Sequence, residues 1–217
     1  MPRQALTQIE IELFRTAYCE KAYELYKYGD YHSISMRGIA KAIGCSSMMA
    51  YRYFEDKDDV FASLRAIFFD RLANSLVAVP ESLSPLNDLK KLAMAYAGFA
   101  HKEPHAYRLL YMIHIQKANT YPQVEQAQLR TQKVLVNATM RAKESGDIQG
   151  DPVVLVHTLW ALIHGLVSLD LASQLNQGAN FDQLFPNMLD QLLKNYSSKH
   201  DLNKYNPTNN NDFEKHP

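Results

Sequence analysis

Apolar residues in this chain recur every three to four positions, and no stretch alternates apolar with polar residues as a half-buried strand does. The recurrence predicts an all-α protein. One helix is expected between Asp56 and a break marked by Pro80 and Pro85. A second is expected to begin at Pro152, because a proline is tolerated in the first turn of a helix. The remaining expected helices lie at about 7–28, 35–43, 46–54, 86–100, 104–116 and 122–144.

The end of the chain is less regular. A last helix is expected at about 181–196, but Pro186 leaves its start open, near Phe181 or near Pro186 itself, because an interior proline removes a helical hydrogen bond. Residues 197–217 are rich in Asn, Lys and Asp, which is typical of a disordered tail.

A polar second helix distinguishes the segment from residue 35 to residue 54. Ser35 is placed to cap a short helix, and Gly44 supplies the left-handed residue that ends it. Between residues 31 and 54 every charged residue is basic. The outward set of the second helix consists of Ser46, Ser47, Met48, Tyr51 and Arg52. Two helices that meet at a glycine turn, the second exposing polar, aromatic and cationic side chains, are typical of a helix-turn-helix that enters the DNA major groove.

Two separate elements of the sequence resemble the TetR (tetracycline-repressor-like) family of transcriptional regulators. The first comprises Ser35-Met36-Arg37-x-Ile39-Ala40, Gly44-x-Ser46 and Tyr51-Arg52-Tyr53-Phe54-x-Asp56-Lys57-Asp58. The second, with Trp160, His164 and Gly165, is similar to the Trp-His-Gly (WHG) element of one TetR subgroup. The resemblance implies an amino-terminal three-helix DNA-binding domain at 1–56, a connecting helix at 57–79 and a larger helical domain for ligand binding and dimerisation at 80–196.

The resemblance also implies how operator DNA is contacted. Helix amino termini and hydroxyl groups hold phosphates, while the second helix of the motif faces base edges and Arg52 reads guanine. Two alternatives stay open: Tyr53 as a core aromatic and Arg37 as a solvated surface residue. The implied DNA-binding residues are Ser35, Arg37, Ser46, Ser47, Met48, Tyr51, Arg52, Tyr53 and Lys57.

One recognition helix gives too little contact for tight specific binding, so such proteins usually dimerise. The resemblance implies that the last two long helices form a four-helix bundle between subunits. Ordinary intrachain core is the alternative for the same side chains, Trp160 included. The interface residues expected on this basis are Leu159, Ile163, Leu166, Val167, Leu171, Leu189, Leu192 and Leu193.

A small-molecule pocket is the third implication. The helices expected at 86–116 and 122–144 would enclose an apolar or aromatic effector held by a few polar groups. Aromatic and Met residues at helical spacing also suit a plain core, and both interpretations stay open. The expected lining consists of Met94, Phe99, Tyr107, Arg108, Tyr111, Met112, His114 and Trp160.

Composition narrows the remaining possibilities. The 217 residues are 47% hydrophobic, as in globular proteins, and Lys+Arg and Asp+Glu each number 23, so any electrostatic footprint for DNA has to be local. Cys19 and Cys45 suggest no disulfide framework. The amino terminus shows no signal-peptide pattern, and the apolar segment 153–175 carries polar and charged residues, so we expect a soluble cytoplasmic protein with no membrane partner.

Other chemistry finds little support in the sequence. We expect no metal and no cofactor, although His101 and His105 are four residues apart and His157 and His164 seven apart. We also expect no enzyme, since neither a Gly-rich phosphate loop nor a nucleophile elbow is found. The sequence thus predicts a dimeric regulator, most simply a repressor released by an effector. The alternatives are a helical partner-binding or scaffold protein with an unused helix-turn-helix and a ligand-binding helical enzyme.

Overall fold

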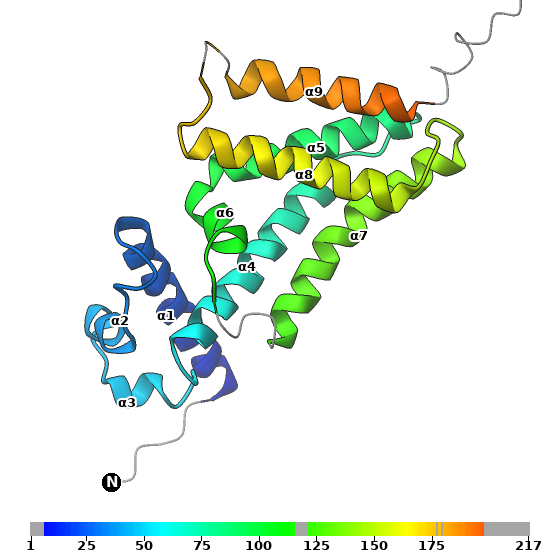
Figure 1. Ribbon diagram of the computed structural model, residues 1–217. Helices are drawn as coiled ribbons and strands as arrows, with labels where there is room; N and C mark the ends of the chain where they lie inside the picture. The colour runs from blue at the N-terminus through cyan, green and yellow to red at the C-terminus, as the bar shows by residue number, and fades with distance from the viewer. Residues whose placement is uncertain (1–6, 116–120, 177, 179, 198–217) are drawn as a thin grey trace, which may run out of the picture. The chain divides into compact units, whose positions relative to one another are not determined.

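The computed structural model describes residues 7–115, 121–176, 178 and 180–197, and within these ranges the chain is helical without strands (Figure 1). The all-α prediction is therefore confirmed. The helices are α1 (Gln8–Tyr28), α2 (Met36–Ile43), α3 (Ser47–Ala50), α4 (Lys57–Val77), α5 (Pro85–Lys102), α6 (Pro104–Tyr111), α7 (Pro122–Glu144), α8 (Pro152–Leu171) and α9 (Phe181–Tyr196). Except for Ser197, the expected tail lies outside the described residues.

Local signals set the ends of α2 and the start of α4 where the sequence predicts them. The hydroxyl of Ser35 accepts the amide of Gly38 at the start of α2, and Gly44 ends that helix in the left-handed region at φ +80°. Asp56 accepts the amide of Asp59 at 2.9 Å and so caps α4. The open question at Pro186 is settled: α9 begins at Phe181 and contains the proline.

The chain divides into two compact units, and the division falls within α4 and α7. The first contains residues up to Asn74 together with Lys102–Thr131, and the second contains Ser75–His101 and the part from Gln132 onward. These units differ from the boundaries expected at residues 56 and 79, because α6 and the start of α7 group with the amino-terminal helices. The reason is contact across α4: the Thr131 hydroxyl donates to the Phe69 carbonyl, and the Tyr111 ring lies 5.8 Å from that of Phe69.

The first unit is built on an aromatic core. Tyr18 on α1 is fully buried, and its hydroxyl donates to the carbonyl of Met36 at 2.7 Å, which ties α1 to α2. The Tyr18 ring lies 5.2 Å from that of Phe54. Arg65 on α4 is also buried, and its guanidinium donates to the carbonyls of Leu109 and Ile113 at the end of α6.

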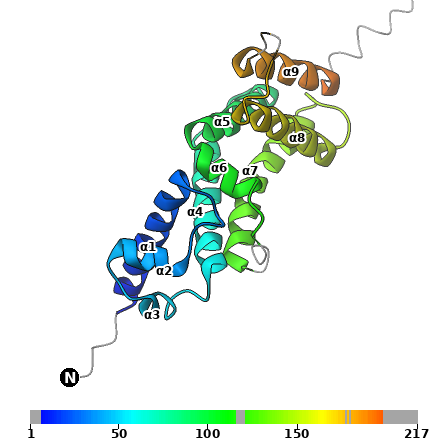
Figure 2. The same cartoon turned by 60° about the vertical axis from the view of Figure 1, so that its left-hand side comes forward.

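The second unit contains a pair of antiparallel helices, α8 and α9, which lie side by side in both views (Figure 1, Figure 2). The amide of Gln149, just before α8, donates to the carbonyl of Tyr196 at 2.7 Å, which joins the beginning of α8 to the end of α9. His101 of α5 lies 2.8 Å from the Asp170 carboxylate of α8. The buried residues of the pair include Leu155, Leu159, Ile163, Leu166 and Val167 of α8 and Phe181, Phe185, Leu189 and Leu193 of α9.

Candidate nucleic-acid interface and ligand cavity

The segment expected to read DNA is a single helical turn held by two buried anchors. Ser46 caps α3 by accepting the amide of Met49 at 3.2 Å. Ala50, at the end of α3, is fully buried, and Phe54, just after the turn, is 2% exposed, so both residues fix the turn to the core of the first unit. Met48, by contrast, is 80% exposed and Tyr51 57%. The anchored turn therefore exposes Met48, Tyr51 and Arg52 to solvent, as the sequence predicts, whereas Ser47 is partly buried.

Helix α2 supports this turn and has an exposed basic side of its own. Ile39 and Ala40 are buried, while Arg37 and Lys41 are exposed. Gly38 also has a local role, because a Cβ at this position would lie 3.2 Å from the Ser35 hydroxyl oxygen that caps the helix. The lower helix propensity of glycine is thus offset by room for the cap. Ser35, Arg37, Ser46, Met48, Tyr51 and Arg52 are exposed, and Ser47, Tyr53 and Lys57 are partly buried.

Tyr53 has the packing that the core-aromatic alternative predicts, and its contact with DNA stays a prediction. Its ring lies 5.2 Å from that of Phe14, and its carbonyl accepts a hydrogen bond from Arg15. It therefore packs against α1, although part of its side chain remains exposed.

Arg15 joins three elements around the motif, a role that is not expected from the sequence. Besides the Tyr53 carbonyl, its guanidinium contacts the Asp59 carboxylate at 3.7 Å and lies 4.2 Å from the centre of the Phe54 ring. These contacts link α1, the end of the motif and the first turn of α4. An arginine beside the apolar stripe of α1 is a weak sequence signal, because such side chains usually cover a helix face without a fixed partner.

Lys57 is engaged within the protein itself. Its ammonium group donates to the backbone carbonyl of Tyr31 at 2.9 Å and lies 4.0 Å from the centre of the Tyr31 ring. The Tyr31 hydroxyl in turn donates to Asp58. Burial, followed by the bond to Asp58, raises the pKa of the Tyr31 phenol. An ammonium group has three donors, so the bond to Tyr31 leaves capacity for a phosphate.

The acids that follow the motif serve local structure. Asp56 and Asp59 form the cap of α4, and Asp59 also accepts the amide of Glu55 at 3.0 Å. Asp58 accepts the Tyr31 hydroxyl.

The residues expected to line one effector pocket are distributed over the two units. Tyr107, Arg108, Tyr111, Met112 and His114 belong to the first, whereas Met94, Phe99 and Trp160 belong to the second. Tyr107 and Phe99 are buried, Tyr111 lies among the rings of Phe69 and Tyr107, and Arg108 and His114 are exposed. Helical spacing predicts which residues share a face, but it does not separate an aromatic core from a pocket.

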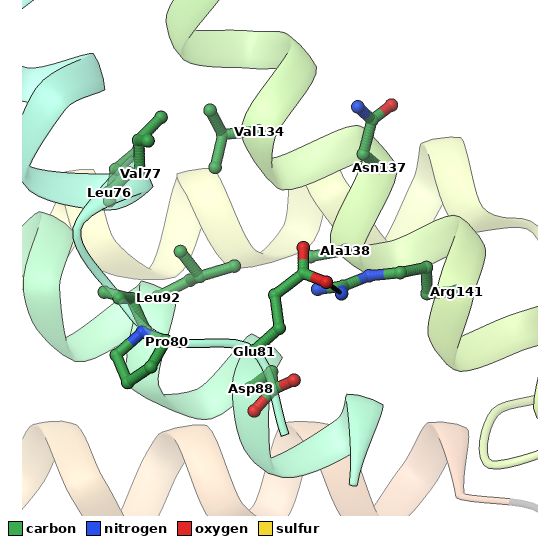
Figure 3. A pocket seen from close by; sticks show the side chains of 11 residues that line it. Leu76, Val77, Pro80, Glu81, Asp88, Leu92, Val134, Asn137, Ala138 and Arg141 are labelled. Atoms are coloured by element: carbon green, nitrogen blue, oxygen red, sulfur yellow. Dashed lines mark ion pairs between the residues drawn. The ribbon is translucent and has the colours of Figure 1, made fainter. Parts of the chain in front are cut away.

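A cavity does occur in the second unit, with a different lining (Figure 3). It has a volume of about 210 Å³ and lies between the end of α4, the segment before α5, α5 itself and α7. Arg141 points into the group of side chains that Figure 3 labels and forms an ion pair with Glu81. The lining comprises Leu76, Val77, Val79, Pro80, Glu81, Asp88, Leu92, Val134, Asn137, Ala138 and Arg141.

The expected interface leucines lie mostly inside the chain. Leu171 and Leu192 are partly buried, and six others are buried, namely Leu159, Ile163, Leu166, Val167, Leu189 and Leu193. These six side chains belong to the core of the single chain, which is the alternative interpretation. Little of their surface is left for a partner subunit. The sequence pattern does not distinguish the buried side of α8 from its exposed side, because both sides are apolar.

The opposite face of α8 is apolar as well. Among the described residues, α8 has the length and apolar composition that crossing a membrane requires, with a mean hydropathy of 1.7, yet only 39% of that stretch is buried. Trp160 is 40% exposed, and its ring lies 6.0 Å from that of His164. The exposed positions of α8 lie on one side of the helix and comprise Val153, Val154, His157, Trp160, Ala161, Gly165 and Leu169.

Comparison with known proteins matches both parts of the chain. The family model described as "Bacterial regulatory proteins, tetR family" matches residues 19–64, and that described as "Tetracyclin repressor-like, C-terminal domain" matches residues 89–192. No curated protein matches.

Solved structures agree in fold. A Rhodococcus sp. RHA1 protein of unknown function is 22% identical, with a TM-score of 0.75 over 91% of this chain and 100% of its own. A TetR family transcription regulator from Marinobacter aquaeolei VT8 is 19% identical, with a TM-score of 0.66 over 88% and 99%. The TetR family transcriptional regulator PfmR from Thermus thermophilus is 15% identical, with a TM-score of 0.61 over 82% and 97%. Since two matching family models cover both the helix-turn-helix and the carboxy-terminal helices, the chain belongs to the TetR family of DNA-binding transcriptional regulators.

Proposed function

We propose that this regulator is a cytoplasmic homodimeric repressor that leaves its operator when a small effector binds. The observation that carries the DNA-binding part is the turn at residues 46–52, which is anchored at Ala50 and Phe54 and exposes Met48 and Tyr51. A segment that is anchored to the core and still exposes its polar side enters a groove without having to refold, so little conformational entropy is lost on binding.

The exposed side chains suggest a division of labour on the duplex. Arg52 is suited to the two acceptors of a guanine edge, and the Met48 side chain to a thymine methyl group. Arg37, Tyr51 and Lys57 are suited to phosphates, which fix the register of the protein without reading sequence. Ser46 and Ser47 complete the surface with hydroxyl groups that donate or accept.

The exposed face of α8 supports the homodimer. A helix this apolar that leaves Trp160 40% exposed and Val153 58% exposed is typical of a helix that is buried against a partner. Ala161 and Gly165 are small residues on this face, which permits a second helix to approach closely. We therefore assign the partner contact to the exposed side of α8 rather than to the buried leucines. The positions of Trp160, His164 and Gly165 also support membership of the WHG subgroup.

Effector control is supported by the course of α4. This helix begins at Lys57, directly after the motif, and ends at Val77 in the lining of the 210 Å³ cavity. A ligand in the cavity thus contacts the helix that also follows the DNA-binding turn. Such a ligand lowers operator affinity only if it binds more tightly to the DNA-free arrangement than to the DNA-bound one.

The DNA-binding part is tested by gel shift on an operator selected from random duplexes with the wild-type protein. We expect Arg52→Ala to weaken binding by about 1–3 kcal/mol and to relax specificity at one base pair. Lys57→Ala should weaken binding to all sequences. It should also reduce the slope of log affinity against log salt concentration by about one unit, which corresponds to one lost phosphate contact.

The matched control is Lys133→Ala, which removes an exposed positive charge from α7. Circular dichroism shows whether each variant is folded. If both motif variants bind like the Lys133 variant, the assignment of DNA contacts is wrong.

A further inference from the structure

The cavity of the second unit combines apolar walls with a single cluster of charged groups. Leu76, Val77, Leu92 and Val134 form the apolar part, and Glu81, Asp88 and Arg141 form the charged part (Figure 3). A water molecule occupies about 30 Å³, so a cavity of about 210 Å³ holds a ligand of about seven to ten non-hydrogen atoms. The ligand is therefore small, and the charged cluster decides its chemical class.

Asp88 is already engaged within the protein, because each of its oxygens accepts a hydrogen bond from Ser82. It is 2% exposed and accepts the Ser82 hydroxyl at 2.6 Å and the Ser82 amide at 2.8 Å. Lys91 lies 3.8 Å away. The bonds from Ser82 hold the pKa of the Asp88 carboxyl below its ordinary value. Asp88 thus stays ionised and fixes the segment before α5, and an amine in the cavity would have to compete with the partners that Asp88 and Glu81 already have.

Arg141 is different, because one of its donors is unused. Its guanidinium forms an ion pair with Glu81, but the Nε atom is buried and has no hydrogen-bond partner. A buried donor without an acceptor is costly, and such a group is often explained by a ligand or an ion. The Arg141 side chain is 33% exposed and that of Glu81 is 74% exposed. Glu81 therefore contacts Arg141 from the solvent side, and its carboxylate can move back into solvent at a small cost in free energy.

We propose that the cavity binds a small carboxylic acid as its anion, and that the ligand carboxylate replaces Glu81 on Arg141. A carboxylate accepts two parallel hydrogen bonds from a guanidinium, which would include the unused Nε donor. Both carboxylates together on one guanidinium would place excess negative charge beside buried Asp88, so the ligand displaces Glu81. The aliphatic or aromatic body of the acid lies on Leu76, Leu92 and Val134. This inference gives the chemical class of the proposed effector and rests on that proposed function.

The test is isothermal titration with probes that share one ring and differ in charge: benzoate, benzamide and benzylamine, with hexanoate and hexanamide as an aliphatic pair. We expect at least one of the two acids to bind about tenfold more tightly than its amide, and benzylamine not to bind, because a charge-assisted bidentate contact is lost in each case. If neither acid binds more tightly than its amide, the proposal is wrong.

Two substitutions assign the binding to Arg141. Glu81→Gln removes the competing carboxylate and should tighten binding of the acid several-fold, whereas Arg141→Met should weaken it about tenfold or more. Arg141→Lys keeps the charge but lacks the paired donors, so it should also bind weakly. The matched control is Lys90→Met, which removes a cation that pairs with Asp190 outside the cavity and should leave binding unchanged.

Operator binding is measured separately, so the two proposals can fail independently. If the acid binds at Arg141 but does not change operator affinity, the cavity assignment stands and the effector role is wrong. If Arg141→Met binds the acid as tightly as the wild type, or Glu81→Gln does not tighten binding, the cavity assignment is wrong whatever the DNA result.

Discussion

At the residue scale, three arginines perform different tasks with the same side chain. Arg15 joins α1 to the end of the DNA-binding turn and to α4. Arg65 is buried and donates to carbonyl oxygens, and Arg141 faces a cavity with one donor unused. None of these roles could be predicted from the sequence, because a fixed partner for a long side chain depends on tertiary contacts. The cap at Ser35 and the left-handed Gly44 could be predicted, because both are set within a few residues.

Arg65 should be the more important of two arginines on α4. Its bonds of 2.7–3.1 Å to the carbonyls of Leu109 and Ile113 satisfy the end of α6, and its charge interacts favourably with that helix terminus. Arg65→Met leaves these carbonyls without their donors and should lower the free energy of unfolding by about 2–3 kcal/mol in urea denaturation.

Arg71→Met is the comparison for this substitution. Arg71 forms an exposed ion pair with Glu103 at 3.0 Å, and its loss should cost less than about 1 kcal/mol. Equal losses for the two variants would contradict the role assigned to Arg65.

His164 gives the protein a pH dependence of known sign. Burial lowers the pKa of the His164 imidazole from its ordinary value of 6.5. As the pH falls below about 6.5, the unfolded chain takes up a proton at this site before the folded chain does, so the folded state loses stability.

The stability of wild type relative to His164→Gln should therefore be constant above neutral pH and decrease as the pH falls below about 6.5. Urea denaturation of both proteins at several pH values measures the difference in their free energies of unfolding. The contributions of the other histidines are the same in both proteins and cancel in this difference. A difference that rises on acidification would mean that His164 is stabilised in its charged form.

At the element scale, α8 and α9 show where sequence patterns reach their limit. The start of α9 is fixed by Asn180, whose side chain accepts the amide of Gln183 at 2.9 Å, and this cap outweighs the interior Pro186. Proline at this position leaves the carbonyl of exposed Asp182 to water. For α8, the difficulty is that apolar residues lie on both sides. Its hydrophobic pattern predicts burial without indicating which face α9 covers.

Gly165 permits a direct test of the α8 face. Gly165 and Gly98 are both exposed helical glycines at which an added Cβ would meet no atom within 4 Å in the single chain. Gly165→Glu should shift the protein from dimer to monomer, because it places a charge in the proposed interface. Sedimentation velocity measures the change.

Gly98→Glu on α5 is the paired control and should leave the oligomeric state unchanged. Both substitutions improve helix propensity, so neither is expected to unfold its helix. Dimerisation that survives Gly165→Glu would exclude this face as the subunit contact.

At the scale of the whole molecule, the sequence predicts the order and type of the helices better than their grouping. Most expected helices agree to within a few residues, although α6 ends at Tyr111 rather than near residue 116. The grouping differs because α6 and the start of α7 belong with the amino-terminal helices. The residues expected to line one pocket therefore belong to two different units. The cavity that the structure contains is lined by other residues, Arg141 among them. Long-range packing decides such groupings, and periodicity within one helix carries no information about it.

The anchoring of the DNA-binding turn has a consequence for how this protein can change its target. Ala50, Phe54 and the Arg15 contacts hold the turn, whereas Met48, Tyr51 and Arg52 contribute little to the core. Because folding and reading are assigned to different side chains, the exposed three can be exchanged together at small cost to stability. The first unit is therefore a suitable scaffold for libraries that select new operators.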